Sequence, residues 1–112
     1  QANNVKAEAG ENKELASSIK DLETTNRQLA SYNKGLRSKI ANMDAATAKA
    51  NRKQLDKVLR TQKSNLSNAK KASVRNDGSK SLKNQVERLT SEVSSLERTR
   101  TQLLKVEQGT RV

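Results

Sequence analysis

The feature that most restricts what this chain can fold into is a heptad pattern between Leu15 and Met43. Apolar residues recur there at alternating steps of four and three residues. This spacing places one apolar stripe along a helix, and over about four heptads it is typical of a coiled coil rather than of a globular amphipathic helix. The a and d positions of this first seam are Leu15, Ile19, Leu22, Asn26, Leu29, Asn33, Leu36, Ile40 and Met43.

Two consecutive a positions of the first seam are polar, Asn26 and Asn33. An unpaired amide in an apolar seam is costly, whereas an amide paired across it can fix register and favour two parallel strands. Two interpretations stay open: the asparagines specify pairing, or they form a polar layer that is tolerated. In both cases the pattern predicts that the seam pairs with a helix outside this chain.

The composition argues against a packed globular core. The 112 residues include no Phe, no Trp and one Tyr, and 31% are apolar, where ordinary soluble domains have roughly 45–50%. There is also no Pro, the strongest helix breaker. We therefore expect helices that bury narrow apolar stripes against one another.

A second seam follows the strongest turn signal in the chain, Asp77-Gly78 flanked by Asn and Ser. Glycine can take the left-handed conformation that ends a helix, and a serine can cap the next helix by accepting from its free N–H groups. The apolar a and d positions of this second seam are Leu82, Val86, Leu89, Val93, Leu96 and Leu103, and Arg100 and Glu107 occupy its remaining a positions.

The expected fold is all-α, an extended coiled coil with one long helix over about 12–75 and a second over about 80–108, joined at Asn76–Ser79. The heptad register fails after Met43, but the alanines that follow are strong helix formers, so we expect the helix to continue through a local adjustment of the supercoil. The two helices form either a kinked rod or a helical hairpin. In the hairpin, four acids lie beside the basic residues of the first helix: Glu87, Glu92, Glu97 and Glu107.

The expected organisation has six segments. They are a frayed end at 1–11, a heptad coiled coil at 12–46, a basic helical segment at 47–75, a turn or hinge at 76–80, a second heptad helix at 81–108 and a tail at 109–112. Since the chain starts with Gln1 and not Met, we interpret it as a segment of a larger protein, with a processed product as the alternative.

Basic residues are concentrated in one block. Residues 47–81 contain ten Lys/Arg and two acidic residues, against seven and six in residues 1–46. Clustered cations along a helix are typical of a protein that binds an acidic polymer or surface, although a solvated face that keeps the rod soluble is the alternative. The residues expected to bind an acidic partner are Lys49, Arg52, Lys53, Lys57, Arg60, Lys63, Lys70 and Lys71.

The residue types restrict the possible functions. Without His or Cys, the chain lacks imidazole bases, thiol nucleophiles and the commonest zinc ligands, and its four glycines are isolated, so no phosphate-binding loop is present. We expect no enzyme activity, no metal and no cofactor. No apolar run is long enough to cross a membrane, and the absence of Cys fits a cytoplasmic location.

We expect a structural coiled-coil protein that builds or decorates a filament or other large assembly. Its seams would pair with copies of itself or with other coiled-coil helices, and its basic block would dock on an acidic filament or protein surface. The alternative is a nucleic-acid-associated coiled coil without sequence specificity. With a single aromatic residue, stacking on single-stranded bases is not expected.

Overall fold

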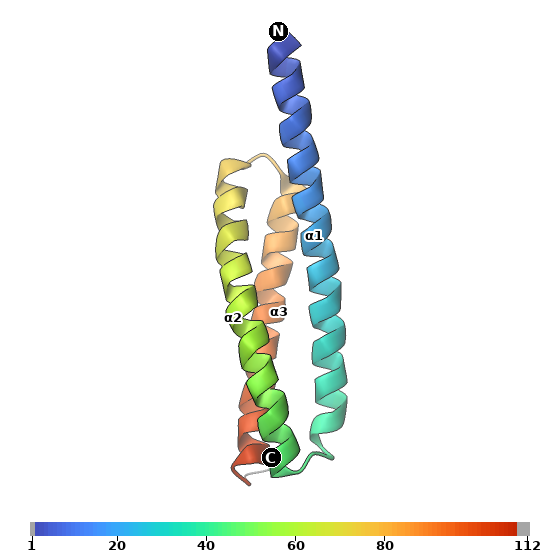
Figure 1. Ribbon diagram of the computed structural model, residues 1–112, viewed down its shortest axis with the longest axis vertical. Coiled ribbons are helices and arrows are strands. Elements are labelled where there is room, and N and C mark those ends of the chain that lie inside the picture. Colours follow the sequence, from blue (N-terminus) through green and yellow to red (C-terminus); the bar gives the residue numbers. More distant parts are fainter. Residues whose placement is uncertain (1, 110–112) are drawn as a thin grey trace.

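The computed structural model describes the backbone of residues 2–109 and the side chains of residues 13–109. Three helices, α1 (Ala2–Ile40), α2 (Ala45–Arg75) and α3 (Lys80–Glu107), lie side by side, and the described residues contain no strand (Figure 1). The shape is extended, 66 × 19 × 19 Å. The N-terminal part of α1 projects beyond the ends of the other two helices (Figure 1).

The expectation of one helix over 12–75 is wrong, because the chain turns back after Ile40. Backbone bonds from Asn42 to Lys39 and from Met43 to Ile40 close the turn. Asp44 is extended, at φ −83° and ψ 173°, and its side chain accepts from the Thr47 N–H at 2.7 Å. This N-cap satisfies a donor that an uninterrupted helix would bond internally, so α2 starts at Ala45 as a separate helix.

The second connection lies where the turn signal placed it. At the end of α2 the backbone N–H of Asn76 donates to the Ala72 carbonyl, and at the start of α3 the Ser79 hydroxyl accepts from the Leu82 N–H at 3.2 Å. These two caps end one helix and begin the next. Of the expected terminal segments, residues 2–11 belong to α1, whereas Gln1 and residues 110–112 lie outside the described residues.

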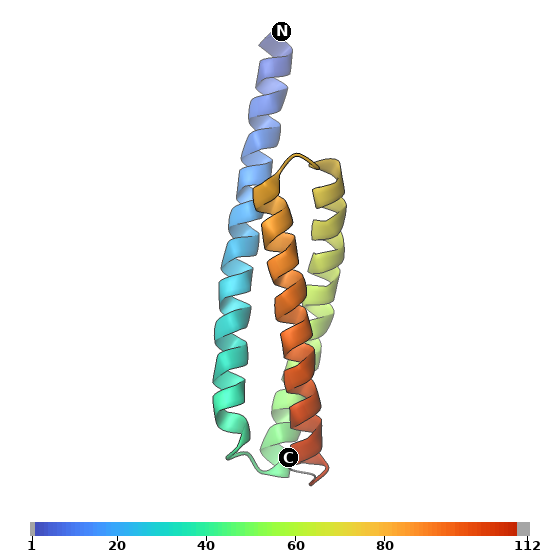
Figure 2. The same cartoon turned by 180° about the vertical axis from the view of Figure 1, so that it is seen from behind.

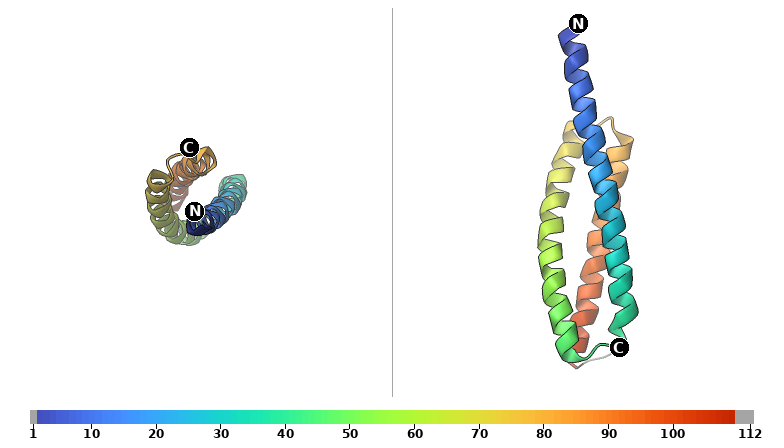
Figure 3. Two further views of the ribbon diagram at one scale, coloured as in Figure 1. Left: turned by 90° about the horizontal axis from the view of Figure 1, so that it is seen from above. Right: turned by 45° about the vertical axis from the view of Figure 1, so that its right-hand side comes forward.

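Helix α3 packs against both other helices, whereas α1 and α2 contact each other little. Figures 1 and 2 show that α1 and α3 run in the same direction and α2 in the opposite one, and Figure 3 shows the three helices from above and from a further side. α3 is central because apolar side chains cover a wide part of its surface. Its buried residues are Leu82, Val86, Leu89, Val93, Leu96, Thr99, Leu103 and Val106.

The first seam packs on α3 of the same chain over much of its length. Leu29, Leu36 and Met43 are buried, and Asn26, which is fully buried, donates from Nδ2 to the backbone carbonyl and the side-chain Oε1 of Gln85 at 3.2 and 2.9 Å. The expectation that the whole seam requires a helix from another chain is therefore corrected: α3 occupies that place between Asn26 and Met43.

The second seam asparagine belongs to a polar layer between α1 and α3. Asn33 donates from Nδ2 to the Ser95 hydroxyl at 2.7 Å, and its Oδ1 accepts from the Thr99 hydroxyl. Arg37 donates from Nε to the same Thr99 hydroxyl at 3.0 Å. Further towards the N-terminus the seam is less covered, and Leu15, Ile19 and Leu22 are only partly buried, as is Ile40 at the opposite end of α1.

Candidate docking surface on helix α2

Helix α2 carries most of the net positive charge, because it has nine Lys/Arg and one acidic residue while the whole chain has a net charge of +11. Because successive helix positions are rotated by about 100°, these cations fall on different faces. The core face, with Ala48, Leu55, Leu59, Leu66 and Ala69 buried, points towards the bundle. The opposite, solvent-facing side carries what we call the outer stripe: the exposed side chains of Lys49, Lys53, Lys57, Arg60 and Lys71.

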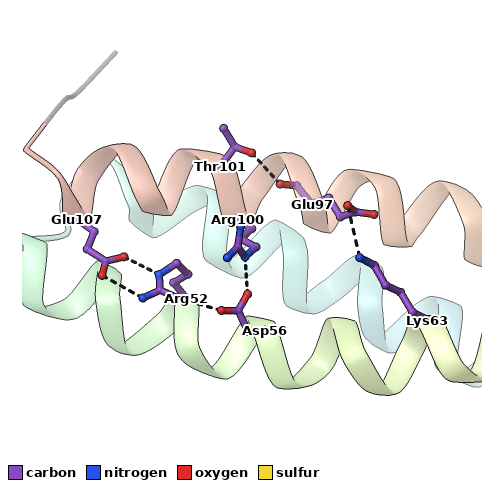
Figure 4. Close-up of polar contacts among 7 residues, drawn as sticks. All are labelled: Arg52, Asp56, Lys63, Glu97, Arg100, Thr101 and Glu107. Carbon is purple, nitrogen blue, oxygen red and sulfur yellow. Dashed lines mark hydrogen bonds and ion pairs between the residues drawn. The ribbon is translucent and has the colours of Figure 1, made fainter.

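Two other predicted binding residues, Arg52 and Lys63, lie on the edge of α2 that faces α3 (Figure 4). Arg52 makes a two-pronged contact with Glu107, from Nε to Oε2 at 2.6 Å and from Nη2 to Oε1 at 3.1 Å. Its Nη1 also donates to Asp56 Oδ2 at 2.9 Å. Such paired, planar bonds between guanidinium and carboxylate are stronger and more directional than a single contact, so Arg52 holds α3 rather than facing a partner.

The same edge continues with two further ion pairs. Arg100 of α3 donates from Nε to the second oxygen of Asp56 (Figure 4). One turn further along, Lys63 lies 3.7 Å from Glu97, and both side chains are about half exposed, at 56% and 50%. This outermost contact is the weakest of the set, because exposed ion pairs contribute little. We call Arg52, Asp56, Lys63, Glu97, Arg100 and Glu107 the edge cluster.

The carboxylates of the edge cluster are stabilised in their charged form. Hydrogen bonding from Arg52 lowers the pKa of Glu107 below its ordinary value, against the opposing effect of desolvation. For Asp56, desolvation alone would raise the pKa, but hydrogen bonds and charge from Arg100 and Arg52 outweigh it and lower the pKa. Glu107 in turn raises the pKa of Arg52. The three groups are therefore charged and mutually neutralised at neutral pH.

Pairing within the edge cluster leaves the outer stripe without a direct partner, although the charges of Lys49 and Lys53 lie near enough to Glu107 to help lower its pKa. None of the five stripe residues makes an ion pair or a side-chain hydrogen bond with another described residue, whereas the acids beside them, Asp56, Glu97 and Glu107, all have cationic partners. Lys70 is also exposed and unpaired among the described residues, and since it follows Arg52 by about five full turns it lies on the edge side of α2 rather than on the stripe. The structure thus divides the eight predicted binding residues into two that pair with acids of α3, Arg52 firmly and Lys63 weakly, and six that form no pair with a described residue.

Sequence reasoning missed two residues of this region. Arg100 occupies an a position of the second seam, and that position, together with Asp56 as the sole acid of α2, was the available signal for their pairing. Arg75 is exposed four residues after Lys71, so the helical spacing alone places it on about the same face. Of the four acids expected beside α2 in a hairpin, Glu97 and Glu107 form pairs with it, and Glu87 and Glu92 form none among the described residues.

A groove of about 380 Å³ lies between α1 and α2, with Leu22, Ala72 and Leu82 on its walls and Asp21 among its polar residues. Within residues 2–109, no group of His, Cys, Asp and Glu is arranged to hold a metal ion, and none of the three helices has an apolar stretch long enough to cross a membrane.

Comparison with known proteins identifies no relative of this chain. The chain matches no protein-family model, no curated protein and no solved structure. A function for the surface on α2 therefore rests on its own charges and geometry.

Proposed function

We propose that this protein is a structural interaction protein, a coiled-coil unit that builds or decorates a larger assembly and docks the outer stripe on an acidic partner surface. The observation that carries the proposal is the charge distribution on α2. Lys53, Lys57 and Arg60 are exposed and unpaired among the described residues, while each neighbouring acid of the edge cluster is already neutralised.

The size of the stripe suits such a role. A single exposed ion pair contributes only about 0.2–1 kcal/mol and is weakened by salt, so useful affinity requires several pairs formed together. The five stripe residues extend over about six turns of one rigid helix and can contact a partner at the same time. Their unbalanced positive charge would also speed encounter with an acidic surface.

The projecting part of α1 supports the assembly part of the proposal. Leu15, Ile19 and Leu22 continue the first seam towards this projection; they pack at the margin of the apolar core and remain partly exposed. The helix itself extends past the bundle (Figure 1). A further heptad helix packed there would bury these side chains, which is how coiled coils extend and join.

Binding to two acidic polymers tests the docking role. The full chain is titrated against polyglutamate and against duplex DNA at about 0.15 M salt, where surface charges farther apart than roughly 8 Å are screened. We expect polyglutamate to bind and DNA to compete poorly. Tighter binding of DNA would replace the proposal with the nucleic-acid alternative, and binding of neither would reject a docking role for the stripe.

Two variants locate the binding surface. The stripe variant carries Lys53→Gln, Lys57→Gln, Arg60→Gln and Lys71→Gln. The control variant removes as many exposed cations elsewhere, by Lys34→Gln, Lys39→Gln, Arg98→Gln and Lys105→Gln. We expect the stripe variant to lose binding and the control variant to keep most of it, with helicity unchanged in both. Equal losses would show that net charge, and not the stripe, determines binding.

A further inference from the structure

The outer stripe follows one side of α2, with four cations close together and the fifth, Lys71, separated from them by about three turns of helix. Lys49, Lys53 and Lys57 follow one another at steps of four residues, Arg60 follows three residues later, and Lys71 lies on the same side of α2 towards its end. Steps of three and four residues keep side chains on one face of a helix. From Lys49 to Lys71 the row is roughly 33 Å long at 1.5 Å per residue.

We propose that the acidic partner is itself an α-helix that lies lengthwise along α2 with its carboxylates on one face. This inference rests on the proposed function and narrows its partner to one geometry. Two helices have the same rise per residue, so acids at steps of three and four residues stay level with the stripe over its whole length. A helix of this kind can pair with all five cations without bending or reordering.

An unstructured acidic chain fits the stripe less well. It would have to lose backbone entropy to line up its carboxylates, whereas a helix in a folded assembly has already lost it. The stripe also offers no apolar side chain in its middle to offset that loss: between Lys53 and Arg60 the apolar residues Leu55, Val58 and Leu59 are buried or partly buried towards the bundle.

Duplex DNA also fits less well. Its phosphates wind around the axis with a turn of about 34 Å, which is close to the length of the stripe. A row of cations on one side of a rod therefore meets phosphates only where it crosses a strand. An acidic helix places carboxylates along the entire row, and the geometry consequently favours a protein helix over nucleic acid.

Two helical peptides of identical composition test this inference. Both are Ala-rich and contain the same number of Glu residues; the facial peptide has them at three- and four-residue steps on one side, and the scattered peptide has them around the helix. Circular dichroism verifies that the peptides are equally helical, and fluorescence anisotropy with the full chain measures their affinities. We expect the facial peptide to bind about tenfold tighter, since a few exposed pairs of ordinary strength give that factor.

The variants and DNA complete the experiment. The preference for the facial peptide should disappear in the stripe variant and persist in the control variant, and duplex DNA should bind more weakly than the facial peptide. Equal binding of the two peptides, or a preference that survives in the stripe variant, would overturn the helical partner and leave acidic docking itself standing. Failure of both peptides to bind the folded chain would overturn the docking proposal as well.

Discussion

Two faces of α2 carry basic residues, but those on one face form ion pairs within the protein and those on the other face are exposed to solvent. On the edge that faces α3, the side chain of Arg52 is 17% exposed and contacts two carboxylates. On the outer side, its neighbour Lys53 is exposed and unpaired among the described residues. One step along a helix, a rotation of about 100°, separates a cation that stabilises the bundle from one that remains available to a partner. Charge alone therefore does not identify binding residues. Whether a cation is available to a partner depends on whether an acid of the same protein lies within reach of it.

The largest expected effect on stability comes from disrupting the packing of α2 on the bundle, which separates its edge from its outer face. Leu59 is 5% exposed in the contact between α2 and the bundle, and Leu59→Ala removes buried methyl groups and leaves a cavity. We expect a loss of about 2–5 kcal/mol in the free energy of unfolding, measured by urea denaturation.

Val74→Ala is the matched control, because Val74 is an exposed apolar residue of the same helix at 78% exposure. Its free energy of unfolding should change by less than about 0.5 kcal/mol. Similar losses in both variants would mean that α2 does not bury Leu59 in solution, and the distinction between edge and outer face would fall with it.

A substitution in the interface between α1 and α3 is expected to change stability by a smaller amount and to leave docking unchanged. Asn26 is fully buried and its Oδ1 has no hydrogen-bond partner among the described residues. Replacing a buried polar group of this kind by an apolar one of similar shape removes its desolvation cost. Asn26→Leu should raise the free energy of unfolding by about 1 kcal/mol and leave polyglutamate binding unchanged.

Urea denaturation and the binding titration check that variant together. A loss of stability on Asn26→Leu would show that the bonds to Gln85 outweigh the unpaired oxygen. Weaker polyglutamate binding would show that the interface between α1 and α3 is coupled to the outer stripe.

Acidification should weaken the ion pairs of the edge cluster, because it protonates their carboxylates, and should leave the charge of the outer stripe unchanged. The pKa values of Asp56 and Glu107 are lowered from 3.8 and 4.5 in the folded chain, so their contribution is present above these values. It is lost as the pH falls through the lower, folded-state pKa values. We expect the free energy of unfolding to decrease below about pH 4, measured by denaturation between pH 7 and pH 2.5.

The variant Asp56→Asn with Glu107→Gln is the comparison for the pH series. It should be less stable at pH 7 and should lose less stability on acidification, because the groups that titrate have been removed. Parallel pH profiles for this variant and the parent chain would show that the edge cluster does not stabilise the fold.

The sequence predicts the helical nature of the fold and its second joint, but it wrongly predicts a continuous helix through the first joint. Asp77-Gly78 and the nearby serines predict that the last helix starts at about residue 80, and in the structure it starts at Lys80. The break at residues 41–44 was visible only as a failure of the heptad register after Met43. Because alanines follow, helix propensity favours a continuous helix. The N-cap bond of Asp44 replaces a bond within that helix only once the chain has turned, so the residues around it do not reveal the turn.

The candidate site was predictable as a block of cations and not as a surface. Which cations remain exposed depends on the pairing of α2 with α3, and this pairing brings Glu107 to Arg52 from 55 positions away in the chain. Periodicity within one helix carries no information on such a distant acid. For the same reason the partner of Asn26, Gln85 on α3, could not be read from the first seam.

The most direct test compares the neighbours Arg52→Gln and Lys53→Gln, each by thermal unfolding and by titration with polyglutamate. Arg52→Gln should lower the melting temperature and leave binding nearly unchanged. Lys53→Gln should keep the melting temperature and weaken binding roughly two- to threefold, as expected for one exposed ion pair. If Lys53→Gln lowered the melting temperature as much as Arg52→Gln and left binding intact, the division of α2 into a structural edge and a docking face would be contradicted.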